Sequence, residues 1–245
     1  GNLATLAAIG LARSLVAGGS RLERAAAARK ASQAVASFGT PPDLSPFEVI
    51  PVIGALPPDE ASAFADLLVA TIDRQRRRLE EEEVPAGISD EAAVAIVRGA
   101  QRQQAELLAR QVPVFAIAGA LGVALAQQAD GDAEAAERTV LEAIAAAQQT
   151  RLAGPQVAAL AIGTGIVAER DDGEAAAVRQ AFLHVFAATI EVDPGFLDAP
   201  RIRALFDRPL ALAAAGALRQ LGDGDDPALR RRASALLELL RQPIL

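Results

Sequence analysis

The chain has 245 residues, of which 51% are hydrophobic and 22% are charged, so it is long and apolar enough to form a sizeable core. Cys, Met, Trp and Tyr are absent and His184 is the sole histidine, which removes most side chains used in nucleophilic, metal or redox chemistry. The net charge of −7 argues against a nucleic-acid surface and against adhesion to anionic lipid, because both need clustered Lys and Arg.

The apolar residues are mostly Ala and Leu, and the 3% of aromatic residues are all Phe. Ala and Leu favour helices, whereas the β-branched and aromatic residues that favour strands are few, so we predict an all-α fold. The missing residue types indicate a reduced alphabet. This favours an engineered or computationally designed sequence over a natural one.

Helix starts and ends are marked clearly along the chain, and about 9–12 helices are expected. Two capping boxes are predicted, one formed by Ser20 with Glu23 and one by Ser45 with Glu48. Proline is tolerated in the first helical turn, because its missing N–H would be unpaired there. Three glycines are expected to end helices in the left-handed conformation: Gly18, Gly39 and Gly154.

The predicted helices follow from these signals, with Pro51 breaking the third. They run over residues 3–17, 20–38, 46–55, 58–80, 90–111, 113–129, 132–150, 155–169, 174–190, 200–206, 209–221 and 227–241. Longer loops are expected at residues 40–45, 81–89 and 191–199. The other connections are short, as between helices that pack as neighbours.

The sequence contains an internal repeat with a period of about 42 residues. This spacing separates Pro113 from Pro155, and the Asp130-Gly131 turn from the Asp172-Gly173 turn. A shortened third copy spans residues 209–241. Within it, the stretch from Asp226 to Leu240, with its arginines and leucines, resembles the second helix of a HEAT repeat. The resemblance covers about the last third of the chain and implies architecture alone.

Two architectures are consistent with this pattern. One is a row of helical hairpins, similar to a HEAT or α-solenoid protein, and the other is a compact multi-helix bundle with two central apolar helices. We expect a single all-helical domain over residues 1–245. A division into residues 1–88, with the N-terminal helices, and residues 89–245, with the hairpin repeats, is the alternative.

Residues 112–126 and 155–168 carry no charge. Helices that are apolar on every side are central in a protein or span a membrane, and each segment is shorter than the roughly 20 residues that a bilayer needs. We therefore expect a soluble protein without a signal peptide or a transmembrane helix. Small residues on these helices permit either close packing or a pocket, and the candidate lining residues are Phe115, Gly119, Gly122, Gly163 and Gly165.

His184 is the one candidate cofactor ligand. It lies on the helix 174–190, about 200° around from Phe182 and away from the predicted apolar face. A haem could use it, since the rival ligands Cys, Met and Tyr are absent. No metal site is predicted, because one His and no Cys make a poor zinc site and the Asp-Gly turns are explained by helix capping.

The sequence is most consistent with a non-catalytic helical scaffold or interaction protein, with no nucleic acid and no membrane as partner. It contains no nucleophile elbow and no Gly-rich phosphate loop, so no enzyme is expected. The first alternative is a protein that binds haem or a small apolar ligand in a cavity lined by the Gly/Ala-rich helices. The second is a soluble redesign of a membrane-protein fold.

Overall fold

The computed structural model describes residues 2–83, 90–167, 170 and 172–192, together with residues 227, 230, 231 and 234. Within residues 2–192 and outside those gaps, the chain forms eight helices and no strand, which confirms the predicted all-α class. The helices are α1 (Asn2–Gly18), α2 (Arg21–Phe38), α3 (Pro46–Ile53), α4 (Pro58–Glu81), α5 (Glu91–Asp130), α6 (Ala133–Thr150), α7 (Ala153–Ile166) and α8 (Gly173–Val192).

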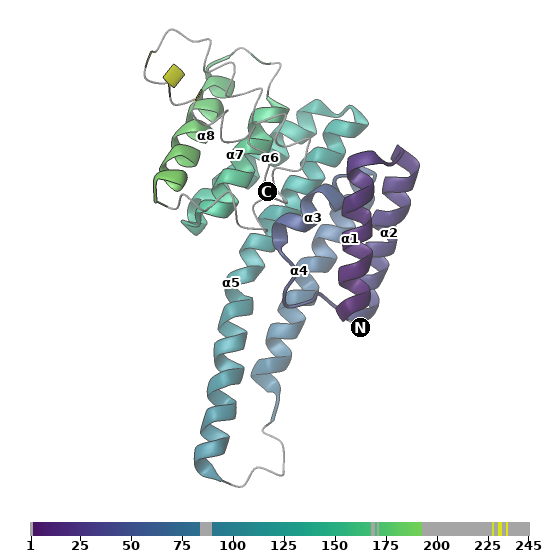
Figure 1. The fold of residues 1–245 in the computed structure, drawn as a ribbon, viewed down its shortest axis with the longest axis vertical. Coiled ribbons are helices and arrows are strands. Elements are labelled where there is room, and N and C mark those ends of the chain that lie inside the picture. Colours follow the sequence, from purple (N-terminus) through teal and green to yellow (C-terminus); the bar gives the residue numbers. More distant parts are fainter. Residues whose placement is uncertain are drawn as a thin grey trace.

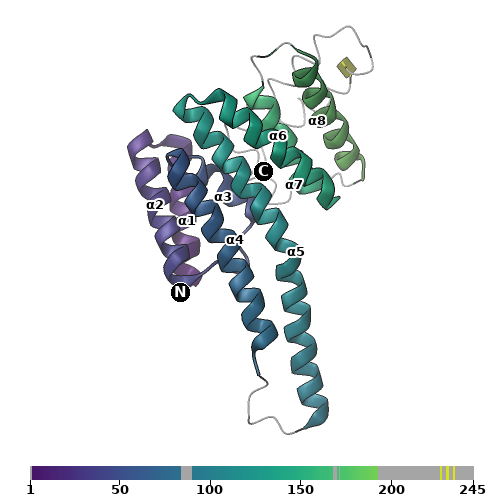
Figure 2. The same cartoon turned by 180° about the vertical axis from the view of Figure 1, so that it is seen from behind.

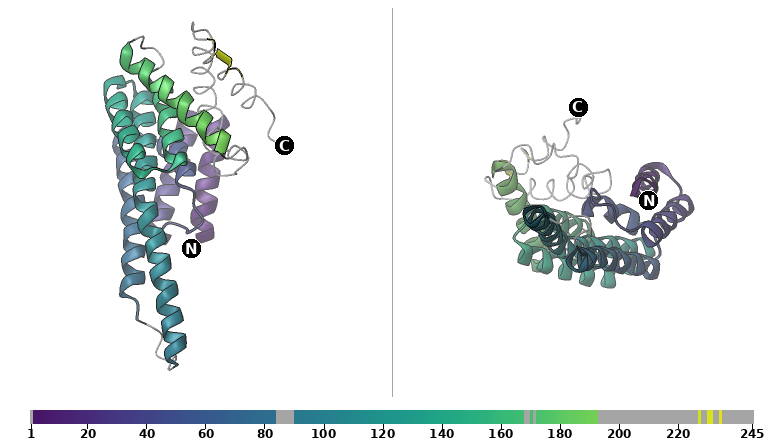
Figure 3. Two further views of the ribbon diagram at one scale, coloured as in Figure 1. Left: turned by 90° about the vertical axis from the view of Figure 1, so that its left-hand side faces the viewer. Right: turned by 90° about the horizontal axis from the view of Figure 1, so that it is seen from below.

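Neighbours in sequence are mostly neighbours in space, so the fold is a series of antiparallel helix pairs (Figures 1 and 2). Seen from below, these pairs form a curved layer from α1 and α2 at one end to α8 at the other (Figure 3). The short α3 packs against α1 and α5 and joins the first pair to the rest of the layer.

The longest pair, α4 and α5, forms a hairpin that projects beyond the other helices (Figure 1). The last buried residue of α4 is Ile72, and the first buried residue of α5 is Ala105. The two helices therefore contact mainly each other and solvent over the projecting part, and the core lies at the opposite end of the hairpin.

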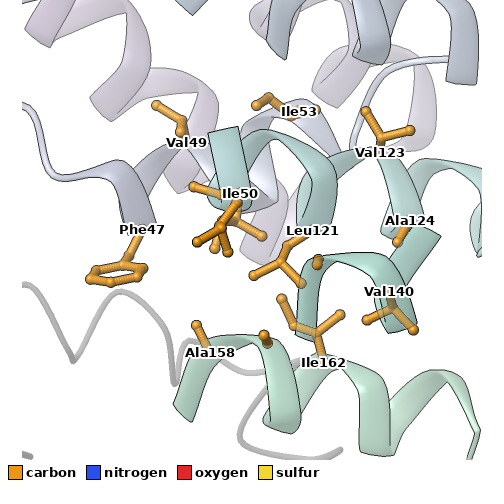
Figure 4. Close-up of a cluster of buried hydrophobic side chains, with 14 of the residues drawn as sticks. Phe47, Val49, Ile50, Ile53, Leu121, Val123, Ala124, Val140, Ala158 and Ile162 are labelled. Atoms are coloured by element: carbon orange, nitrogen blue, oxygen red, sulfur yellow. The ribbon is translucent and has the colours of Figure 1, made fainter. Parts of the chain in front are cut away.

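The core is built where α3, the second half of α5 and α7 meet (Figure 4). Ile50 and Ile53 of α3 lie near Leu121 of α5, and Ile162 of α7 lies on the other side of that leucine. All four side chains are fully buried. The uncharged segments 112–126 and 155–168 supply much of this core, which is why charge is missing from them.

The predicted helix break at Pro113 is wrong, because α5 continues through it as one helix of 40 residues. Pro113 lacks the N–H that would bond to the carbonyl of Ala109, and both residues are exposed. Water can satisfy the orphaned carbonyl, so the helix tolerates the proline. The break expected at Pro51 is also absent. The short helix α3 contains Pro51 and continues to Ile53.

Both predicted capping boxes are present at the starts of α2 and α3. Gly39 ends α2 as predicted and has a positive φ of +83°, but its ψ of −178° differs from the left-handed helical conformation that was expected. The other two expected glycine caps are wrong. Gly18 is the last residue of α1, and Gly154 lies inside α7, which begins at Ala153 rather than Pro155. Arg151, with φ +56°, takes the left-handed position after α6 instead.

The two Asp-Gly turns join antiparallel helices. Gly131, with φ +92°, ends α5, and the side chain of the next residue, Asp132, caps α6. Asp172 caps α8 by accepting hydrogen bonds from the N–H groups of Glu174 and Ala175. The second half of α5 with α6, and α7 with α8, cover the two predicted units, although the first of them does not begin with a separate helix. The HEAT type of the repeat stays a prediction.

Several predicted features lie outside the described residues, apart from the helical positions 227, 230, 231 and 234. They are the third repeat copy, the HEAT-like stretch, the loop from residue 193 to 199 and the helices 200–206, 209–221 and 227–241. Residues 191 and 192, which were predicted to begin that loop, belong to α8 instead. The division near residue 88 also stays a prediction. The helices on its two sides, α4 and α5, pack along each other.

By length and composition alone, α5 is the one described helix that could cross a membrane, and 56% of its most apolar window is buried inside the fold. The expectation of no transmembrane helix rested on segments shorter than a bilayer, and the continuity of α5 removes that argument. One such helix is weak evidence for a membrane span, because the core helix of a water-soluble protein passes the same test.

Candidate functional site

A groove of about 710 Å³ lies between α5 and α6. One wall is formed by Arg110, Pro113, Ala116, Ile117 and Ala120 of α5. The other is formed by Thr139, Glu142, Ala143, Ala146, Gln149 and Thr150 of α6, with Leu152 closing one end. Among the described helices, α5 also contacts α3, α4 and α7, and none of these three lines the groove.

Small side chains create the groove. Ile117 and Ala143 are buried and form its floor, whereas Ala116 and Ala146 are exposed on its two walls. Methyl groups at these positions leave the space between two helices unfilled, which larger side chains would occupy. The result is an open channel with an apolar floor.

Its polar groups lie at the edges. Arg110 and Glu142 are exposed on opposite walls, and neither makes an ion pair with any described residue. The Thr150 hydroxyl is already used, since it donates to the Ala147 carbonyl at 2.7 Å and accepts from the Leu152 N–H at 3.2 Å. The groove therefore offers apolar contact and two charges of opposite sign.

A second, polar hollow of about 190 Å³ lies between the end of α2 and the middle of α4. Arg74 and Arg78 line it beside the last residues of α2. Gln75 donates to the Thr40 carbonyl at 2.9 Å and ties the two elements together. Cations beside a helix C-terminus complement its dipole, so this hollow is explained by the way α2 ends.

His184 is exposed on α8 and does not line either hollow. Phe182 and Phe186, which stack with ring centroids 5.4 Å apart, are buried on the same helix. The predicted apolar face of this helix is therefore the buried one, and the histidine points away from it. No group of three His, Cys, Asp or Glu side chains that could hold a metal ion occurs among the described residues.

The predicted lining residues line neither of these two hollows. Phe115 is fully buried. A Cβ built on Gly119 would lie 2.8 Å from the Cβ of Ala65, and one built on Gly163 would lie 2.8 Å from Cδ1 of Ile144. Gly122 is packed even more closely against Ile53, and Gly165 is partly buried. Of the two possibilities that the sequence left open, the structure has close packing at Gly119, Gly122 and Gly163.

No protein-family model, curated protein sequence or solved structure matches this chain.

Sequence reasoning missed the groove. Ala116 and Ala120 belong to the uncharged stretch that was expected to be buried on every side, and no residue type marks one side of it as exposed. The available signal was indirect. The helix that follows has Thr139, Glu142, Ala146 and Gln149 at helical spacing, a face of small and polar residues that does not fill the space beside α5.

Proposed function

We propose that this chain is a non-catalytic helical interaction protein that binds a partner in the groove between α5 and α6. The observation that carries the proposal is the groove itself, which is open and apolar at its floor and has a charge on each wall. Helices bind in such grooves by burying one apolar face. The exposed position of His184 and the scarcity of reactive side chains support a role without catalysis.

A small apolar ligand is the second candidate, since about 710 Å³ lies within the range of ligand sites. Ligand pockets usually enclose most of the ligand, whereas both walls of this groove carry exposed residues such as Pro113 and Ala146. An elongated occupant that covers the channel along its length fits this shape better. The narrow residue alphabet further supports a sequence designed for its fold, which is part of the same proposal.

The test is binding of a fluorescent anilinonaphthalene dye, which becomes bright on apolar surface, to dilute protein. The Ala116→Arg variant places a long charged side chain in the groove, and we expect it to lose most of the dye signal. Ala26→Arg is the matched control, because Ala26 is exposed in the middle of α2 and far from the groove in sequence. Equal dye signals from the two variants would contradict the proposal.

A further inference from the structure

We propose that the partner is a second copy of this chain, whose own α5–α6 groove packs against the first around a two-fold axis. The inference deepens the proposed function and rests on it. A two-fold interface uses the same surface on both copies, so each residue of one copy must meet a suitable residue of the other. The charges, the spacing and the side-chain sizes of the groove are each consistent with this requirement.

The charges are self-complementary. Arg110 on α5 and Glu142 on α6 are exposed at the two walls, and each is without an ion-pair partner among the described residues. A two-fold axis midway between them brings Arg110 next to the partner's Glu142, and Glu142 next to the partner's Arg110. Both unpaired charges are thereby matched in one step, and opposite charges at an interface fix its register.

The spacing locates that axis. Because α5 and α6 run antiparallel from the turn at Gly131, Thr150 lies level with Pro113 in the groove lining. On the same register Glu142 lies level with Leu121, roughly 16 Å along α5 from Arg110 at the usual helical rise. The midpoint falls at Ala116 of α5, close to the level of Ala146 of α6.

The smallest exposed side chains of the groove thus lie at the axis, where two copies must approach most closely. Ala116 and Ala146 permit close contact between helices, as small residues do in tight helix pairs.

The experiment is sedimentation velocity of the full chain over about a hundredfold range of concentration, since mass action must shift a reversible dimer. We expect twice the mass of the chain at high concentration. Arg110→Glu and Glu142→Arg should each weaken association about tenfold, because each places like charges opposite each other. The double variant should restore association to within about threefold of the original, because it re-forms both pairs with the signs exchanged.

Lys30→Glu makes the same change in net charge as Arg110→Glu, but on α2 and away from the groove, and should leave association unchanged. Both groove charges are exposed, so these variants should fold, and circular dichroism checks this. A chain that stays monomeric over the whole range overturns the inference, as do single reversals without effect or a double variant that is not restored. If the monomeric chain still binds the dye at Ala116, the dimer is refuted while the groove remains the proposed site for another partner.

Discussion

A Cβ atom placed on Gly122 of α5 would lie 2.5 Å from the Cβ of Ile53 in α3, a distance that non-bonded carbons do not reach. One turn earlier on α5, Gly119 stands in the same relation to Ala65 of α4, at 2.8 Å. Two glycines three positions apart therefore let the long helix lie against α3 and α4 at once. The backbones of α3, α4 and α5 can come this close because glycine carries only a hydrogen atom where other residues carry a side chain.

Gly122→Ala is expected to destabilise the protein by about 1–3 kcal/mol, because the new methyl group must push α3 away from α5. The free energy of unfolding in urea, followed by circular dichroism, measures the effect.

Gly99→Ala is the control in the same helix, since no atom lies within 4 Å of a Cβ built on Gly99. It should stabilise the protein by up to about 1 kcal/mol, because alanine favours helix over glycine. If Gly122→Ala stabilised the protein as Gly99→Ala does, helix propensity and not the contact with Ile53 would govern position 122.

These glycines show how far sequence reasoning reaches. The spacing of Gly119 and Gly122 on an uncharged helix predicted either close packing or a pocket, and the structure has the former. The choice depends on Ala65 and Ile53, which are distant in sequence and belong to other helices. Local patterns give the helices and their caps, whereas the residue that faces a given glycine is set by the packing of the whole fold.

Pro113→Ala is expected to raise the free energy of unfolding by about 1–3 kcal/mol. It restores the N–H that can bond to the Ala109 carbonyl, and it removes the proline ring from the middle of α5. The gain is reduced because proline also restricts the unfolded chain. Thermal melts of the two proteins measure the difference. A loss of stability would mean that the packing of α5 on its neighbours requires a bend at Pro113.

Acid should destabilise the protein partly through Asp172. Hydrogen bonds from the backbone N–H of Ala175 and from Arg170 hold the pKa of this carboxyl below its usual value. The folded state thus favours the charged form, and the unfolded state takes up the proton first as the pH falls. The stabilisation is present above the unfolded pKa and is lost as the pH falls through the folded pKa.

Asp172→Asn tests this, because asparagine also caps helices but does not titrate. Its stability should fall less steeply than that of the original protein below about pH 5. Asp172→Ala, which removes the cap, should lower the free energy of unfolding at neutral pH as well. Urea unfolding at several pH values separates the two effects. Parallel pH profiles for the original protein and the asparagine variant would rule out Asp172 as a source of acid sensitivity.

The groove illustrates the opposite limit of sequence reasoning. The prediction that residues 112–126 are buried holds for Ile117 and Leu121, yet Pro113 and Ala116 in the same uncharged stretch are exposed. A helix without charges gives no sign of which side its neighbours leave open. That side is decided by where α3, α4 and α7 pack on α5, and these contacts join residues far apart in the chain.

His184→Ala is expected to change the free energy of unfolding by less than about 0.5 kcal/mol, as do most substitutions at exposed sites. Phe186→Ala, on the buried face of α8, should instead cost about 3–5 kcal/mol. Because His184 is exposed and lines neither of the two hollows, haemin added to the protein should give no Soret shift that depends on this histidine. A shift that His184→Ala abolishes would overturn this expectation and would place a haem against α8.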